Sequence, residues 1–341
     1  MSMEQTWRWY GPKDPVSLSD IRQAGATGIV TALHDIPIGE VWPLEDILSR
    51  KDEIILDRSK NPPAERGLTW SVIESVPVHE EIKTAGEKRD EFIEKYKETL
   101  RNVGKAGIKT VCYNFMPVVD WTRTNLQFKL EDGAYALAFD MSDFIAFDLF
   151  ILEREGAEGD YTKEQIEKAN KAYENMSDEQ RYILRKNIIA GLPGAQEGYS
   201  LESFKQKLND YKDITPDIYR ENLAYFLKEV IPVAEEAGVR LAVHPDDPPY
   251  PLFGLPRVVS SEADFNFLLG VRDSVSNGIT FCTGSLAVNP DNDLVGMVQR
   301  LGAKINFAHL RSTQRDLDGS FHEASHLQGD VDMYNVILSI L

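Results

Sequence analysis

Three residues that bind transition metals well stand at equivalent positions in the C-terminal part of the sequence. His244, Cys282 and His309 each end a short apolar run of the kind that forms a buried strand. Neutral imidazole and thiolate are good ligands for divalent Mn, Fe, Co or Zn, and the ends of strands spaced ~4.8 Å apart can converge on one ion. Singly, each residue is more typical of a core histidine or an inert buried cysteine. Together, their matched positions predict a metal site.

Two further polar side chains could bind a substrate near such a site. Arg311 stands two residues after His309, so in an extended chain both side chains point to the same face. A guanidinium there suits a substrate carboxylate, which it can hold through two hydrogen bonds, although a salt bridge explains it equally well. Asn114 follows another apolar run, and its amide suits substrate hydroxyls or a loop-stabilising hydrogen bond. Arg311 and Asn114 are therefore the candidate substrate-binding residues.

A histidine pair lies in the segment of residues 311–329, for which a polar loop is expected. His322 and His326 match the HExxH pattern of zinc metalloproteases, in which both histidines share one helix face. Aspartate, glycine and serine flank the pair, instead of the apolar residues of a buried helix, and this disfavours a protease. Long loops after barrel strands commonly carry general acids and bases. His322 is therefore the candidate catalytic acid or base within this chain.

The elements that must position these residues alternate between amphipathic helices and short apolar strands, which is typical of an α/β fold with a parallel sheet. Seven strands are expected, at residues 28–33, 68–74, 108–115, 135–139, 239–244, 279–282 and 305–309. The usual closed form of this series is a (β/α)8 barrel of the TIM type, which has its active site at the C-terminal ends of the strands. The last strand of such a barrel is not visible in this sequence.

The middle of the sequence interrupts this alternation. Two capping boxes, Thr162 with Gln165 and Ser177 with Gln180, mark the starts of helices there. We therefore expect a single barrel domain over residues 1–341 with a helical insertion at residues 125–200.

Composition narrows the class of function. The chain has 341 residues and a formal net charge of −18, which repels nucleic-acid phosphates and anionic lipid surfaces. No apolar run approaches the roughly 20 residues of a membrane-spanning helix. The N-terminal residues lack the features of a secretory signal, and two cysteines are too few for a disulfide framework. A cytoplasmic protein with no nucleic-acid or membrane partner is expected, and a homo-oligomer is left open.

Five stretches of the sequence resemble the mannonate dehydratase family. They are WRWYG (residues 7–11), YNFMPVVDWTR (113–123), LPGA (192–195), VHPDDPP (243–249) and FAHLRS (307–312). The resemblance implies a (β/α)8 barrel related to the xylose-isomerase-like enzymes, with Mn²⁺ or Fe²⁺ held by His244, Cys282 and His309. It also implies a hydro-lyase acting on a small sugar acid, which converts D-mannonate to 2-dehydro-3-deoxy-D-gluconate. A metal-dependent sugar isomerase or epimerase on the same barrel is the rival enzyme.

The family pattern continues beyond the end of this sequence. After the last helix it has an Arg-Pro-Asp-His-Gly segment that supplies a further aspartate ligand and a catalytic histidine, and later a catalytic tyrosine. This sequence ends at Leu341, so the native protein is expected to carry more residues. A metal-binding but inactive truncated chain is the non-enzymatic alternative.

Overall fold

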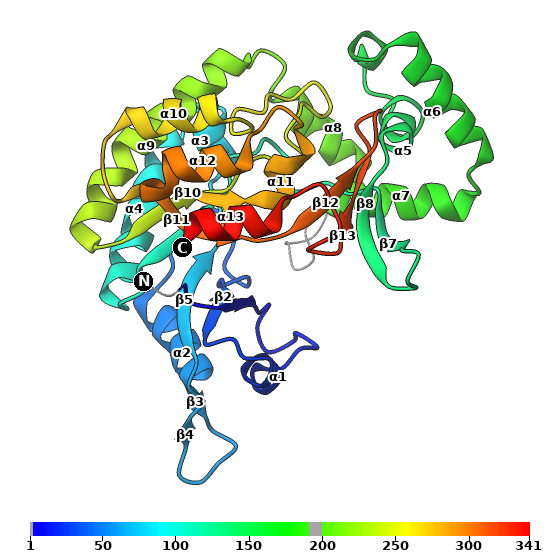
Figure 1. The fold of residues 1–341 in the computed structure, drawn as a ribbon. Coiled ribbons are helices and arrows are strands. Elements are labelled where there is room, and N and C mark those ends of the chain that lie inside the picture. Colours follow the sequence, from blue (N-terminus) through cyan, green and yellow to red (C-terminus); the bar gives the residue numbers. More distant parts are fainter. Residues whose placement is uncertain (1–2, 191–199) are drawn as a thin grey trace.

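The computed structural model describes residues 3–190 and 200–341, and a curled sheet of parallel strands lies at its centre (Figure 1). Within these residues, seven strands hydrogen-bond in the order β1, β2, β5, β6, β9, β10 and β11, and all neighbouring pairs are parallel. Their bounds are Thr6–Arg8, Gly28–Thr31, Thr69–Glu74, Thr110–Tyr113, Arg240–Val243, Asn277–Cys282 and Ile305–His309. The predicted α/β fold with a barrel-type parallel sheet is confirmed, and β1 and β11 are its edges in the described chain.

Both faces of this sheet are covered, which is why its strands are rich in apolar residues. Ile73 of β5 points outward into the main core beneath the helices. Alternate residues point to the inside of the curl, where Val30, Val72 and Cys112 form a small second core against Phe307. Beyond this small core, toward the C-terminal ends of the strands, the inward-facing residues of several strands are polar. These polar residues line the mouth of the curled sheet.

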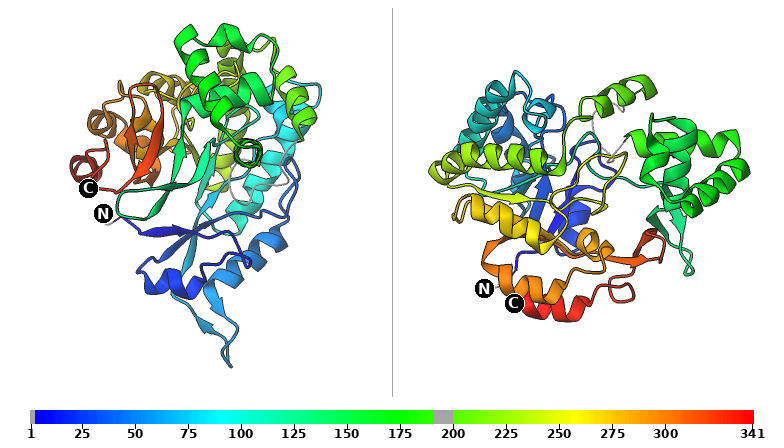
Figure 2. Two further views of the ribbon diagram at one scale, coloured as in Figure 1. Left: turned by 90° about the vertical axis from the view of Figure 1, so that its right-hand side faces the viewer. Right: turned by 90° about the horizontal axis from the view of Figure 1, so that it is seen from above.

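Helices lie around the outside of the sheet (Figure 2). They are α2 (Leu44–Ile55), α4 (Arg89–Lys105), α9 (Pro216–Ala237), α10 (Glu262–Val271), α12 (Leu294–Leu301) and α13 (Met333–Ile340). Local sequence explains the bounds of α9, because Thr215 caps its N-terminus, Pro216 takes the first helical position and Gly238 ends it with a φ of 67°. Helices α4 and α9 approach closely at Gly104, where a Cβ atom would lie only 2.4 Å from the carbonyl oxygen of Ala237.

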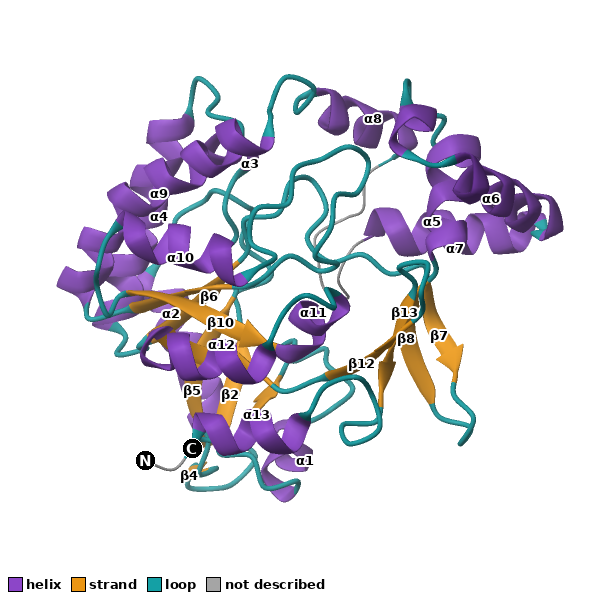
Figure 3. Cartoon of the chain, turned by 45° about the horizontal axis from the view of Figure 1, so that its top comes forward, coloured by secondary structure: helices purple, strands orange, loops and turns teal. Residues whose placement is uncertain are grey.

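A second, antiparallel sheet stands beside the first (Figure 3). Its strands are β7 (Asn125–Lys129), β8 (Tyr135–Phe139), β12 (Ser312–Arg315) and β13 (Phe321–Ala324), in the order β12, β13, β8, β7. It adjoins α5 (Met141–Ala146), a π-helix (Phe147–Ile151), a 3-10 helix (Ala157–Asp160), α6 (Lys163–Asn175) and α7 (Asp178–Ala190). Both predicted capping boxes form, at the starts of α6 and α7.

One predicted strand was assigned to the wrong sheet, and one predicted loop contains strands. Residues Tyr135–Phe139 form a strand, but it belongs to the second sheet, and residues 311–329 contain the hairpin of β12 and β13 instead of a polar loop. The sheet's first strand, β1, was not predicted, because three residues of mixed polarity give little periodic signal. An apolar run indicates a strand, but its partner is set by contacts distant in sequence.

The remaining elements are short. They are α1 (Leu18–Gln23), β3 (Leu56–Asp57), β4 (Ala64–Glu65), α3 (Glu80–Lys83), α8 (Leu201–Asn209), α11 (Thr283–Val288) and a 3-10 helix (Gly302–Lys304). Among the described residues, no helix has the length and apolar character needed to cross a bilayer. The LPGA stretch at residues 192–195 lies outside the described residues.

Candidate metal centre

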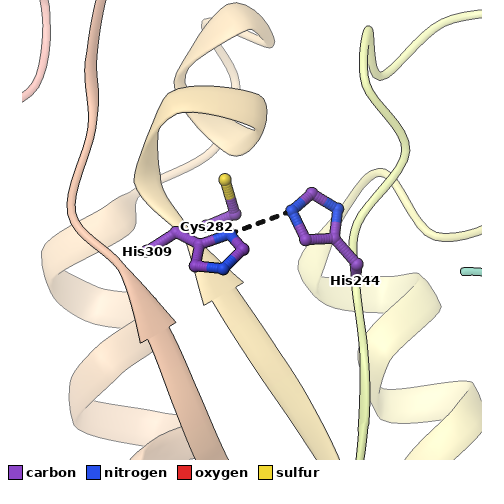
Figure 4. Close-up of side chains that lie close together, drawn as sticks. All are labelled: His244, Cys282 and His309. Carbon is purple, nitrogen blue, oxygen red and sulfur yellow. Dashed lines mark hydrogen bonds between the residues drawn. The ribbon is translucent and has the colours of Figure 1, made fainter. Parts of the chain in front are cut away.

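His244, Cys282 and His309 meet at the mouth of the curled sheet (Figure 4). Cys282 and His309 are register partners at the ends of β10 and β11, and His244 directly follows β9, the other neighbour of β10. The three candidate ligand atoms all lie within 4.8 Å of one another, and Nε2 of His244 is 3.1 Å from Nδ1 of His309. The structure thus brings together the three residues that strand-end spacing selected.

Hydrogen bonds determine which nitrogen each histidine turns toward the centre. Nδ1 of His244 lies 2.7 Å from the carbonyl oxygen of Pro245, which can only accept, so Nδ1 donates and Nε2 keeps its lone pair. Nε2 of His309 lies 3.2 Å from Oε2 of Glu74 and donates to it, so in the neutral ring Nδ1 of His309 has the lone pair. Both lone pairs therefore face the same point as the Cys282 sulfur. Such outer partners are typical of metal-binding histidines, and the residues fit a metal ion.

The charges around Cys282 favour its thiolate form. Burial raises the pKa of a thiol, but the guanidinium of Arg311, with Nη2 3.3 Å from Sγ, acts together with His244 and His309 and holds the pKa of Cys282 well below its usual range. Burial also disfavours a charged His309, yet the Glu74 carboxylate and Cys282 raise the pKa of His309 to about 10. The cluster by itself therefore pairs a thiolate with an imidazolium, and a divalent cation can take the place of that proton.

Two arginines and two carboxylates form a cluster on the Cys282 side of the centre. Asp247, 1% exposed, pairs with Nη1 of Arg123 and Nη2 of Arg311, each at 2.7 Å, and Glu323 pairs with both arginines. Burial raises the pKa of a carboxyl, but Arg123 and Arg311 hold the pKa of Asp247 well below its usual range. Two positive and two negative charges balance, which is what makes such a cluster tolerable in the interior. Glu323 belongs to β13, so the cluster also joins the second sheet to the metal centre.

The other predicted site residues lie at different distances from this centre. Arg311 adjoins it through Cys282. Asn114 directly follows β6; its Nδ2 donates to Asp120, and its buried Oδ1 has no hydrogen-bond partner within the described residues. His322 lies on β13 with its ring 4.9 Å from the ring of Phe128, and its side chain faces away from the neighbouring Glu323. The structure does not bring His322 to the triad, and a strand cannot provide the helical geometry of the HExxH pattern.

Four residues that support the centre received no specific role from the sequence. Glu74 is the last residue of the strand predicted at residues 68–74. Arg8 lies in WRWYG, while Arg123 and Asp247 lie in other stretches that resemble the mannonate dehydratase family. The position of Glu74 could have indicated that its side chain faces the mouth, because it lies two residues after Val72, which faces the inside of the curl on β5.

Comparisons with known proteins identify the family of this chain. Residues 3–341 match the family model described as D-mannonate dehydratase (UxuA). The chain is 56% identical over 340 residues to a mannonate dehydratase of Marinomonas sp. (strain MWYL1), covering 99% of this chain and 85% of the relative. It is 49% identical over 339 residues to that of Saccharophagus degradans, covering 99% and 83%. The crystal structure of mannonate dehydratase from Streptococcus suis serotype 2 matches with a TM-score of 0.77 and 38% identity, covering 100% of this chain and 82% of that one. The chain therefore belongs to the mannonate dehydratase family.

Proposed function

We propose that this chain is a metal-dependent D-mannonate dehydratase, a hydro-lyase that converts D-mannonate to 2-dehydro-3-deoxy-D-gluconate. The observation that carries the proposal is the pair of facing histidine nitrogens beside the Cys282 sulfur, in a chain of the mannonate dehydratase family. A cytoplasmic location is part of the proposal, and fractionation of the source cells checks it.

The reaction removes a weakly acidic proton from C2, next to the substrate carboxylate, and hydroxide from C3. A divalent ion, for which we propose Mn²⁺ or Fe²⁺, would supply Lewis-acid stabilisation of the negative charge that develops on the substrate oxygens. His244, Cys282 and His309 would hold it. The imidazole and thiolate donors suit such an ion, and the outer hydrogen bonds of both histidines support this assignment.

Residues of the mouth would bind the sugar acid and move its protons. Arg311 supports binding of the carboxylate, because its side chain is 29% exposed and it lies beside Cys282. The unpartnered Oδ1 of Asn114 supports acceptance of a hydrogen bond from a substrate hydroxyl. His322 stays a prediction as acid or base, since its ring lies against Phe128. His322→Gln should lower kcat if His322 carries protons, and an unchanged kcat removes it from the mechanism.

Metal content measured together with turnover on D-mannonate tests the proposal. Protein stripped with a chelator should not form the 2-keto acid, and Mn²⁺ or Fe²⁺ should restore turnover. Full activity of metal-free protein would contradict the mechanism. Aldose–ketose exchange without 2-keto acid formation would favour the isomerase or epimerase instead. Metal binding without any turnover would favour the inactive metal-binding chain.

A further inference from the structure

Glu74 connects the metal centre to the first strand of the sheet. It is the last residue of β5, and one of its oxygens, Oε2, lies 3.2 Å from Nε2 of His309 and 2.9 Å from Nη1 of Arg8. Arg8 is the last residue of β1. Only 12% of the Glu74 side chain and 21% of the His309 side chain are exposed, so water competes little for these contacts.

The Glu74 carboxylate contacts the edge of the His309 ring that faces away from His244. Nδ1 of His309, on the other edge, is the atom that lies 3.1 Å from His244. In the part of the chain that the structure describes, the close group of candidate ligand atoms contains the triad and not Glu74. A carboxylate can only accept hydrogen bonds, so of the two neutral forms of the ring it selects the one with hydrogen on Nε2. Nδ1 then keeps the lone pair that a metal ion needs.

Arg8 restricts the movement of the Glu74 carboxylate. Its guanidinium contacts the same oxygen as His309 and is itself held over the ring of Tyr10, 5.1 Å from the centroid. Strands β1 and β11 are the two edges of the described sheet. The contacts from Arg8 to Glu74 to His309 therefore run across the inside of the curl, from one edge strand through β5 to the other.

We propose that Glu74 and Arg8 are positioning residues of the metal centre: Arg8 fixes the Glu74 carboxylate, and Glu74 orients His309 so that Nδ1 faces the ion. The inference rests on the metal centre of the proposed function. Neither residue touches the ion in this arrangement. The first strand thus contributes to metal affinity through Glu74.

Metal affinity separates a positioning role from a purely structural one. Glu74→Ala removes the acceptor, and Arg8→Gln leaves the acceptor but frees it to move. The matched control is Glu80→Ala, since Glu80 is also a largely buried carboxylate but pairs with Lys83 and Tyr211. We expect the Kd for Zn²⁺, measured by chelator competition, to rise about 10- to 100-fold in Glu74→Ala. It should rise less in Arg8→Gln and stay near the wild-type value in Glu80→Ala.

Nitrogen NMR of the Zn²⁺-loaded protein adds a readout that lost stability alone would not change. Wild type and Glu80→Ala should carry the His309 hydrogen on Nε2, and Glu74→Ala should show a mixed or reversed form. If Glu74→Ala does not fold, Glu74→Leu, which fills similar space but has no acceptor, carries the same test together with Arg8→Gln. Wild-type Zn²⁺ affinity and an unchanged His309 form in these variants would overturn this inference and leave the proposed function intact. A wild-type protein that binds no divalent ion would overturn both.

Discussion

On the His309 side of the candidate metal centre a carboxylate contacts the candidate ligand, whereas on the Cys282 side a guanidinium does. Glu74 accepts a hydrogen bond from the His309 ring, and Arg311 lies against the Cys282 sulfur. A ring that must keep one nitrogen free needs an acceptor on the other, while a thiolate in the interior needs a positive charge. The supporting charge on each side is thus the one that stabilises the ligand form a metal requires.

The two sides also differ in how deeply their charges are buried. Arg8 keeps 28% of its side chain exposed, but Arg123 and Asp247 are 0% and 1% exposed. A charge that loses its partner near the surface can be hydrated, and one in the interior cannot. Loss of Asp247 or Arg123 should therefore cost more stability than loss of Glu74 or Arg8.

The largest effect on metal binding should come from the sulfur ligand. Cys282→Ser should weaken metal affinity by more than the about 10- to 100-fold that loss of an outer partner costs, because a hydroxyl is a poor substitute for thiolate. Cys112→Ser is the matched control, since Cys112 is also fully buried but packs with Val30 and Val72 inside the curl. Chelator competition gives both affinities. Equal values would remove Cys282 from the ligand set.

The largest effect on stability should come from Asp247. In Asp247→Ala, Arg123 and Arg311 lose a buried partner, and we expect a loss of about 3–5 kcal/mol in the free energy of unfolding. Urea unfolding of the metal-free protein measures it, with Glu74→Ala as the comparison on the other side. A loss in Glu74→Ala as large as that in Asp247→Ala would contradict the difference between the two sides.

Lowering the pH should reduce the contribution of the Asp247 carboxylate to the free energy of unfolding. The folded-state pKa of Asp247 is depressed, so its contribution to stability is present above the unfolded carboxyl pKa of about 3.9 and is lost as the pH falls from there toward the folded-state value. Stability of wild type and Asp247→Asn should therefore differ most near neutral pH and converge below about pH 3.9. A difference that does not change with pH would show that the charge of Asp247 is not what stabilises the fold.

The smallest effect on stability should come from the loss of a surface ion pair whose nitrogen–oxygen distance is similar. Arg300 lies 2.6 Å from Glu262, much as Arg311 lies 2.7 Å from Asp247, but half of the Arg300 side chain is exposed. Arg300→Ala should leave the urea midpoint close to that of wild type, because solvent screens the pair. A shift comparable to that of Asp247→Ala would mean that burial is not the cause of the difference.

The sequence by itself determined the class of fold and indicated the candidate ligand triad. Apolar runs that end in His244, Cys282 and His309 are local patterns, and equivalent ends of parallel strands must lie at one edge of a sheet. The bounds of α9 also follow from local sequence, because capping by Thr215 and termination at Gly238 depend on neighbouring residues only.

Only the tertiary structure decided which residues support that triad and which sheet each strand joins. Glu74 is 235 residues from His309, and Arg123 is 124 from Asp247 and 200 from Glu323. No local pattern encodes such contacts, because they arise when the curled sheet and the second sheet bring distant strand ends together. For the same reason His322 and Glu323, adjacent in sequence, lie on opposite faces of β13, and Glu323, not the predicted His322, reaches the charge cluster beside the metal centre.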